Sequence, residues 1–552
     1  MIFFSHKRNN CKQYFSKILV RLGFAIAIGS FTTPSVLAAE EIFVHYGPLE
    51  FSLSVESLKI YATEGRMTSE LASYADFLTE EQLELLRTNL TRKAEITPLS
   101  VAQFFYSYQG EKILERVGQI VETKSGQSGF YAIRSALILA AASEEGLTPL
   151  NFLETFPLAK IRVDSAQGFE IVEELSQVIQ ASSKAIAAVE EEFYREAITE
   201  SKSIIKGMNA RGNVDYRIES LSLRDTERQR NFPVDLYLPT NSPIDEPLSL
   251  IVISHGLGSD RSTFAYFAQY MASYGFAVAV PEHPGSNASQ IQALLEGFAN
   301  DVTPPEEFID RPLDITYLLD YLEANYGEQI EVRDVGIIGQ SFGGYTALAL
   351  AGAELNFTAL EAACGKLDRS FNVSLFLQCL ALELDTETVR SDLKDPRITS
   401  AIAINPLTSA IFGREGMSEI DIPVMLVSGS ADPVTPALPE QIRPFTWLKT
   451  PETYFVLMKG GTHFSVLNES SGSIPIPQAA IGPDPQIGQE YIKQLGLLFF
   501  SQYYDALKPN FGCVCVNYAA SISRPAMPLH LITELKEDKL ELLLTNTAPF
   551  NP

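Results

Sequence analysis

The sequence predicts an α/β protein, in which a mostly parallel sheet flanked by helices is preceded by an all-helical N-terminal domain. Three observations lead to this fold class. From about residue 210 to residue 505, short apolar runs alternate with helical patterns, the order typical of parallel strands joined by right-handed crossovers. Some of these runs are apolar almost throughout, as strands buried on both faces are. Residues 40–205 instead carry helix-capping motifs and amphipathic helical patterns.

The length and the net charge of the chain limit how many domains and which binding partners we expect. A chain of 552 residues is too long for one core, so we expect two or three domains. A formal charge of −26 at pH 7 repels nucleic acid and anionic membrane surfaces, and neither is an expected partner. No run after the N-terminal region is long and apolar enough to span a bilayer.

Residues 1–38 are predicted to be a signal peptide. A basic region without acidic residues runs to Arg21, and the apolar run Leu22–Gly29 follows it. Small residues then offer a cleavage site after Ala38 or Ala39. The alternative is an uncleaved membrane anchor, but polar residues interrupt the short apolar run. We therefore expect export to the periplasm or the medium, with no membrane span left after cleavage.

Four cysteines follow the predicted signal peptide, and an exported chain permits disulfide bonds. A bond between Cys364 and Cys379 would close one small loop. Cys513 and Cys515 are too close to pair with each other without strain, so we expect other partners or free thiols. A zinc site is the weaker alternative, because the chain has no C-x-x-C motif and no nearby histidine pair. We predict no metal and no cofactor.

The N-terminal domain, residues 40–205, is predicted to be structural or to act as a lid. Thr79 and Gln82 form a capping box, and Thr97-Pro98 and Thr148-Pro149 each place a cap before a proline at the first helical position. The pattern Gly168–Ser203 predicts a long amphipathic helix that docks this domain onto the rest of the chain. We find no titratable cluster here that points to chemistry.

The α/β part, residues 210–505, has strands and helices that the apolar pattern delimits. In such sheets the reactive site lies at the carboxyl ends of the parallel strands. The expected strands are Asp215–Leu221, Val234–Leu238, Leu248–Ser254, Ala277–Val280, a strand from Val335, Ile398–Ile404, Ile422–Val427 and Tyr454–Leu457, and the expected helices are Phe264–Tyr274, Leu313–Leu322 and one after Gln486.

A G-x-S-x-G motif with Ser341 at its centre follows the Val335 strand. A nucleophile elbow needs Gly339 and Gly343, because a Cβ at either position would collide with the neighbouring strand or helix. The turn lifts the hydroxyl above the sheet edge. The turn also places the Ser341 hydroxyl near the N-terminus of the next helix, where backbone N–H groups favour a developing negative charge.

The strand Leu248–Ser254 ends in a glycine-containing loop, His255–Gly258. This composition is expected of an oxyanion loop, whose backbone must come close to the substrate. The N–H groups of Leu257 and Phe342 are the predicted donors to the oxyanion of a tetrahedral intermediate.

Two further strand ends supply the predicted acid and base. Asp432 follows the strand Ile422–Val427, and His463 follows Tyr454–Leu457. The order Ser341, Asp432, His463 is that of α/β hydrolases. His463 would take the serine proton and return it to the leaving group, and Asp432 would fix the tautomer of His463. As alternatives, Asp432 caps a turn and His463 is a satisfied loop histidine.

The other histidines are less suited to proton transfer. His255 begins the oxyanion loop and is expected to orient backbone. His283 follows the strand Ala277–Val280, where packing is the favoured role and lining of an acyl pocket the alternative. His530 lies in the C-terminal tail.

Residues 210–505 resemble the α/β-hydrolase superfamily. His255–Gly258 together with Gly339–Gly344 resembles the platelet-activating factor acetylhydrolase branch and the predicted dienelactone hydrolases near it. Two departures stand out. True dienelactone hydrolases use a cysteine nucleophile, whereas this chain has Ser341. The acetylhydrolase branch takes its acid after the strand that follows the nucleophile, where this chain has Asn405 and the acid appears one strand later, at Asp432.

The resemblance implies a serine esterase that favours short or oxidised acyl groups and needs no metal. A small-molecule or lipid ester is the implied substrate. The N-terminal part resembles a domain of unknown function found ahead of such hydrolases in cyanobacterial proteins.

Residues 354–396 are predicted to be a lid-like insertion, with simple packing as the alternative, and residues 506–552 a C-terminal extension without a motif. The predicted function is therefore hydrolysis of carboxylic esters through an acyl-enzyme intermediate. A non-catalytic binding or scaffold protein on the same fold is one rival, and an amidase or peptidase with the same triad is another.

Overall fold

The computed structural model describes residues 39–46, 49–75, 79–94, 96–123, 125–199, 210–240, 246–367, 370–385, 392–468, 481–504 and 514–545. The predicted signal peptide lies outside these residues and stays a prediction. Among the described helices, none combines the length and the apolar character that crossing a bilayer requires.

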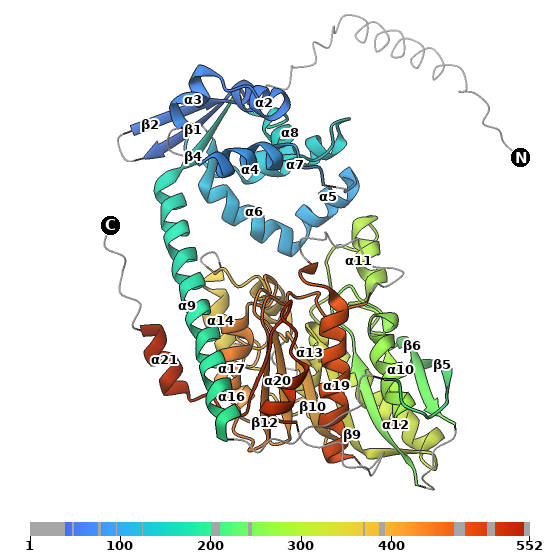
Figure 1. The fold of residues 1–552 in the computed structure, drawn as a ribbon. Coiled ribbons are helices and arrows are strands. Elements are labelled where there is room, and N and C mark those ends of the chain that lie inside the picture. Colours follow the sequence, from blue (N-terminus) through green and yellow to red (C-terminus); the bar gives the residue numbers. More distant parts are fainter. Residues whose placement is uncertain are drawn as a thin grey trace, which may run out of the picture.

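A nine-stranded sheet forms the centre of the molecule, in the order β13-β12-β11-β10-β9-β7-β8-β6-β5 (Figure 1). Every neighbouring pair from β12 to β8 is parallel, and the remaining pairs at the two edges are antiparallel. The large, mostly parallel sheet was predicted and is confirmed. The strands are β5 Tyr216–Asp225, β6 Arg230–Pro239, β7 Leu248–Ser254, β8 Ala277–Pro281, β9 Ile330–Gln340, β10 Ile398–Ile404, β11 Val424–Gly429, β12 Thr453–Met458 and β13 Leu529–Ile532.

Helices flank this sheet and bury it. α10 packs against α19, and α12 packs against α13. Strands β8 and β11 are buried along their whole length, and β7, β9 and β10 are buried toward their carboxyl ends. This explains why their sequences are apolar almost throughout. The helices are α10 Ala265–Ser273, α11 Ala288–Leu295, α12 Glu307–Tyr326, α13 Phe342–Leu350, α14 Phe357–Cys364, α15 Leu375–Gln378, α16 Gly413–Met417, α17 Arg443–Phe445 and α19 Pro485–Tyr503, with the short helices η1 Arg261–Phe264, η3 Cys379–Glu383 and η4 Leu438–Ile442.

The N-terminal unit is not all-helical, and this part of the prediction is wrong. It contains a four-stranded sheet in the order β2-β1-β4-β3, with strands β1 Glu41–Tyr46, β2 Leu49–Ser54, β3 Val121–Thr123 and β4 Lys160–Asp164. Ile42, Val121 and Ile161 from three of these strands share a core with the surrounding helices. The strands are short and β1 pairs with the distant β4, so the local pattern of the sequence is dominated by the helices between them.

The helices of this unit begin where the capping motifs predicted. Thr79 caps α4 with Gln82 completing the capping box, and Thr97 and Thr148 cap α5 and α8 ahead of their prolines. The helices are α2 Val55–Glu64, α3 Ser69–Ala75, α4 Glu80–Leu90, α5 Pro98–Tyr106, α6 Tyr108–Ile120, α7 Phe130–Ala142, α8 Pro149–Glu154 and α9 Ser165–Thr199.

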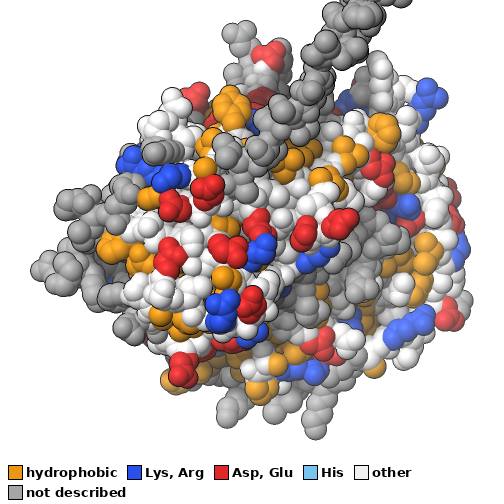
Figure 2. All heavy atoms as spheres, turned by 90° about the horizontal axis from the view of Figure 1, so that it is seen from above, with side chains coloured by type: hydrophobic (Ala, Val, Ile, Leu, Met, Phe, Trp, Pro, Cys, Tyr) orange, Lys and Arg blue, Asp and Glu red, His pale blue; other side chains and the backbone are white. Residues whose placement is uncertain are grey.

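Helix α9 joins the N-terminal unit to the α/β unit, as predicted (Figure 1). It contacts β1, β4 and α6 of the first unit and β13, η4 and α20 of the second. Elsewhere α5 contacts α11, and α6 contacts α15. Because α11 follows the carboxyl end of β8, these contacts place the N-terminal unit over the carboxyl edge of the large sheet. On the face that this unit forms, acidic and basic side chains are interspersed with hydrophobic ones (Figure 2).

The predicted insertion holds α14, α15 and η3 and is fastened to the carboxyl edge of the sheet. Glu440, buried in η4, accepts hydrogen bonds from Ser374 at 2.8 Å and Gln378 at 3.0 Å, and also from Ser409, which follows β10. The predicted disulfide bond between Cys364 and Cys379 is present and ties α14 to η3. That the insertion moves as a lid stays a prediction.

The predicted C-terminal extension contributes to the large sheet. It contains α20 Val516–Ile522, the edge strand β13 and α21 Glu537–Thr545. Cys515 is disulfide-bonded, so it is not the free thiol that was one of its expected states; Cys513 lies outside the described residues.

Candidate active site

Ser341 lies at a sharp turn between β9 and α13. Its backbone has φ 57° and ψ −119°, a conformation that L side chains rarely adopt. Holding a non-glycine residue there costs on the order of 1–3 kcal/mol, so the surrounding structure must enforce it. The Ser341 N–H donates to the Ile404 carbonyl at 2.8 Å, and the Ser341 carbonyl accepts from the Tyr345 N–H at 3.0 Å. The strained turn that was predicted is present.

The two flanking glycines permit close packing on both sides of this turn. A Cβ on Gly339 would lie 2.0 Å from the Gly343 carbonyl oxygen. A Cβ on Gly343 would lie 2.0 Å from the carbonyl oxygen of Ser254, at the end of β7. Real Cβ atoms do not come this close to other atoms, so both glycines are required, as predicted.

His463 and Asp432 form a hydrogen-bonded pair. His463 Nδ1 lies 2.7 Å from Asp432 Oδ2, and both side chains are buried. The other carboxylate oxygen accepts from the N–H groups of Val434 at 2.7 Å and Thr435 at 2.9 Å, and the Thr435 hydroxyl donates to Asp432 Oδ2 at 2.9 Å. These donors orient the carboxylate toward Nδ1, which leaves Nε2 as the nitrogen for proton transfer.

The His463 loop is tied to the nucleophile turn through Gln340, whose side-chain amide donates to the His463 carbonyl at 3.2 Å. Ser341 and His463 are both among the described residues, and no hydrogen bond joins their side chains. Catalytic hydrogen bonds often tighten only in the complex with substrate.

The predicted oxyanion loop lies against the nucleophile. A Cβ on Gly256 would lie 3.3 Å from the Ser341 Cβ and 2.5 Å from Gln340 Oε1. Within the part of the chain that the structure describes, the N–H groups of Leu257 and Phe342 donate to no other group. Both therefore remain available to a ligand beside Ser341, which is what an oxyanion hole requires.

Two family models match the chain. One, described as "Alpha/beta hydrolase of unknown function (DUF1400)", matches residues 38–164. The other, described as "Platelet-activating factor acetylhydrolase, isoform II", matches residues 229–310, which include β7, the His255–Gly258 loop and β8. Over these parts of its length the chain is similar to α/β hydrolases and to platelet-activating factor acetylhydrolases. Its general activity is therefore that of a hydrolase.

This α/β hydrolase contains a second Ser–His–Asp constellation that the sequence did not reveal. Ser254 Oγ lies 3.1 Å from His283 Nε2, and His283 Nδ1 lies 2.9 Å from Asp314 Oδ2 in α12. All three side chains are fully buried. Arg228 and Arg230 also donate to Asp314, at 2.9 Å and 2.8 Å.

Both histidines near the oxyanion loop are neutral hydrogen-bonding groups. Burial, reinforced by the charge of Arg311, holds the pKa values of His255 and His283 well below 6.5. His255 Nε2 accepts from the His283 N–H at 3.0 Å, so its Nδ1–H donates to the Gly256 carbonyl at 2.8 Å. His255 thus orients backbone, and His283 has a structural position, as the sequence favoured.

Asn405 lies directly after β10, the strand end where the resemblance would have placed the acid. Its backbone has φ 44°, and its side chain accepts from the Gly429 N–H at 2.9 Å. The Asn405 carbonyl oxygen lies 3.1 Å from Thr435 Oγ1, whose hydroxyl donates to Asp432. Asn405 therefore supports the loop that carries Asp432.

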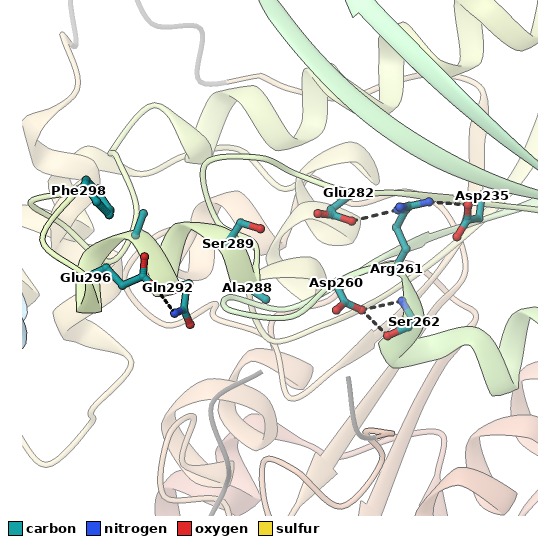
Figure 3. Close-up of a pocket in the computed structure, with 11 residues that line it drawn as sticks. Asp235, Asp260, Arg261, Ser262, Glu282, Ala288, Ser289, Gln292, Glu296 and Phe298 are labelled. Carbon is teal, nitrogen blue, oxygen red and sulfur yellow. Dashed lines mark hydrogen bonds and ion pairs between the residues drawn. The ribbon is translucent and has the colours of Figure 1, made fainter. Parts of the chain in front are cut away.

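Two cavities lie away from Ser341. The larger, about 590 Å³, is lined by residues that follow the oxyanion loop and by α11; in it Arg261 lies between Asp235 at 2.5 Å and Glu282 at 3.0 Å (Figure 3). The other, about 440 Å³, lies between α6 and the insertion. Its walls combine apolar residues with charged residues of both signs, among them Lys112, Arg116, Glu115 and Glu361.

Proposed function

We propose that this α/β hydrolase is an exported serine esterase that uses Ser341, His463 and Asp432. One observation carries the proposal: a strained serine turn lies against a loop with free N–H groups, at a sheet edge that also carries an Asp–His pair joined at 2.7 Å. These are the parts that nucleophilic acyl transfer needs.

In the acylation step, Ser341 Oγ attacks the ester carbonyl carbon while His463 Nε2 takes the hydroxyl proton. The N–H groups of Leu257 and Phe342 stabilise the oxyanion of the tetrahedral intermediate, and each such donor typically contributes about 3 kcal/mol. The intermediate collapses, His463 returns the proton to the departing alcohol, and the acyl group stays on Ser341.

In the deacylation step, water attacks the acyl carbon and His463 accepts a proton from it. The acid product leaves, and Ser341 regains its proton from His463. Asp432 stays ionised through both steps and stabilises the imidazolium of His463.

For the substrate we propose a short or lipid-type acyl ester. The match to platelet-activating factor acetylhydrolases supports this class. The Cys364–Cys379 bond supports export, because such bonds persist in oxidising compartments.

The test compares wild-type protein with the Ser341→Ala variant on p-nitrophenyl esters of increasing acyl length and on matched anilides. We expect wild-type activity on esters, highest for short acyl groups, and loss of that activity in Ser341→Ala. Equal turnover by the two proteins would contradict the proposal. Faster cleavage of the anilides would assign an amidase instead, and absence of both activities would favour a binding protein.

A further inference from the structure

A single buried arginine, Arg311 of α12, connects the two sides of the predicted oxyanion hole. Its Nη2 donates to the carbonyl of His255, two residues before Leu257, and its Nε donates to the Thr346 hydroxyl at 3.0 Å. Thr346 belongs to α13, the helix that begins at Phe342. Arg311 is fully buried, so its guanidinium acts only within the protein.

The guanidinium also contacts Phe342 directly. Its central carbon lies 4.7 Å from the centre of the Phe342 ring. The loop that carries one oxyanion donor and the residue that carries the other thus meet at one planar group. A change in the position of that group would change the separation of the two N–H donors.

The other hydrogen bonds of Arg311 reach the end of β7 and the loop after β8. Nη2 donates to Ser254 Oγ at 3.2 Å, and Nη1 donates to Ser286 Oγ at 2.6 Å, in the loop after β8. The Ser286 hydroxyl in turn donates a hydrogen bond to Glu307 Oε2 at 2.6 Å. The same loop accepts from the oxyanion loop, because the Gly258 N–H donates to the Ser286 carbonyl at 2.8 Å.

Helix α12 holds Arg311 firmly against α13. Pro312 has no N–H to donate to the Phe308 carbonyl, and the Tyr345 hydroxyl of α13 donates to that carbonyl at 2.6 Å instead. Burial lowers the pKa of Arg311 to about 10, so the side chain stays charged at neutral pH. Glu307 and Asp314, four residues before and three residues after it on the same helix, supply the opposite charge.

We propose that Arg311 is a positioning residue, which fixes the Leu257 and Phe342 N–H groups at the separation that the oxyanion requires. The inference rests on the proposed function, in which Ser341 is the nucleophile. A lysine cannot replace Arg311, because one ammonium cannot reach acceptors on three segments as a planar guanidinium does.

The test measures kcat and KM for p-nitrophenyl acetate and the Ki of a trifluoromethyl ketone in Arg311→Lys and Arg311→Met. The ketone forms a tetrahedral adduct with serine and depends on the oxyanion donors. We expect kcat to fall about 100-fold, Ki to rise by a similar factor and KM to change less than about threefold. The matched control is Leu322→Ala, a buried substitution on the same helix. It should lower the melting temperature and leave kcat and Ki near wild type.

Wild-type kcat and Ki in folded Arg311→Lys, or the same losses in Leu322→Ala, would overturn the inference. If the Arg311 variants do not fold, Thr346→Val decides, since it removes one contact of the guanidinium with the nucleophile helix. We expect it to lower kcat and raise Ki together by about five- to tenfold; no change in either would overturn the inference. Failure of the proposed function itself gives a different result, namely a wild-type activity that survives Ser341→Ala.

Discussion

The two Ser–His–Asp constellations of this hydrolase have nearly the same residues and opposite surroundings. In one, His463 is bonded to Asp432 at 2.7 Å beside Ser341. In the other, the chain from Ser254 through His283 to Asp314 is complete, with distances of 3.1 Å and 2.9 Å. By hydrogen bonds alone, the second is the better triad.

The surroundings reverse this ranking. Ser254 is the last residue of a regular strand, is fully buried, and its oxygen also accepts from Arg311. Ser341 has a strained backbone, remains 7% exposed and lies beside the unpaired N–H groups of Leu257 and Phe342. A nucleophile needs access and a site for the developing oxyanion, and only Ser341 has both. A triad is therefore identified by what surrounds the serine.

The largest expected difference between the two constellations concerns the histidines. We predict that His463→Gln lowers kcat about 10⁵-fold, because it removes the base that accepts the serine proton. The same change at His283 should lower kcat less than about tenfold, since His283 does not contact the reacting atoms. Steady-state hydrolysis of p-nitrophenyl acetate measures both. Equal losses of kcat in the two variants would contradict the assignment of His463 as the catalytic base.

The second-largest difference is expected between the two aspartates, Asp432 and Asp314. Asp432→Asn should lower kcat about 10⁴-fold with little loss of stability, because it leaves His463 in the wrong tautomer. Asp314→Asn should instead destabilise the fold by about 1–3 kcal/mol, since it weakens the hydrogen bonds that a fully buried carboxylate accepts from Arg228 and Arg230. Urea unfolding together with kcat separates the two effects. A folded, stable Asp314→Asn protein without activity would contradict this assignment.

A smaller loss is expected in the oxyanion loop. Gly256→Ala places a Cβ 2.5 Å from Gln340 Oε1, so the Gln340 side chain must move, and with it the hydrogen bond that it donates to the His463 carbonyl beside the nucleophile turn. We predict a fall in kcat of about 100-fold, with KM little changed. The control is Gly365→Ala, where the added Cβ meets only the Glu361 carbonyl at 3.3 Å. Wild-type kcat in Gly256→Ala would show that the loop does not form the hole.

The smallest effect is on the pH dependence of stability. His283 has a pKa well below 6.5 in the folded protein, whereas the unfolded chain takes up its proton near 6.5. Below pH 6.5 the unfolded state therefore binds more protons, and stability falls by about 1.4 kcal/mol per pH unit for each such histidine.

In His283→Gln the free energy of unfolding should fall less steeply with decreasing pH, by about 1.4 kcal/mol per pH unit. Urea unfolding of both proteins at several values between pH 7.5 and pH 5.5 measures it. An unchanged slope would mean that His283 carries a proton in the folded state.

The sequence predicted the first constellation because each of its residues follows an apolar strand. Ser341, Asp432 and His463 stand at the ends of β9, β11 and β12, and the parallel order of those strands brings the residues to one edge. The second constellation carries only part of this signal. Ser254 and His283 also stand at the ends of apolar parallel strands, β7 and β8. Asp314 instead lies inside α12, and its contact with His283 depends on how that helix packs.

The fold shows the same difference between features that the local sequence predicts and features that depend on distant segments. Strands buried on both faces, such as Leu248–Ser254 and Ile398–Ile404, were predicted to the residue. The N-terminal sheet was missed, although Glu41–Tyr46 is rich in the β-branched and aromatic residues typical of strands. Its pairing with Lys160–Asp164 is non-local, and the capping motifs between them indicate helices only.

One measurement tests the central distinction most directly. The protein is treated with a fluorophosphonate, digested and mapped by mass spectrometry, with the Ser341→Ala variant alongside. We predict a single adduct on Ser341, none on Ser254, and none in the variant. An adduct on Ser254, or an active wild-type enzyme that is neither labelled nor inhibited, would contradict the account.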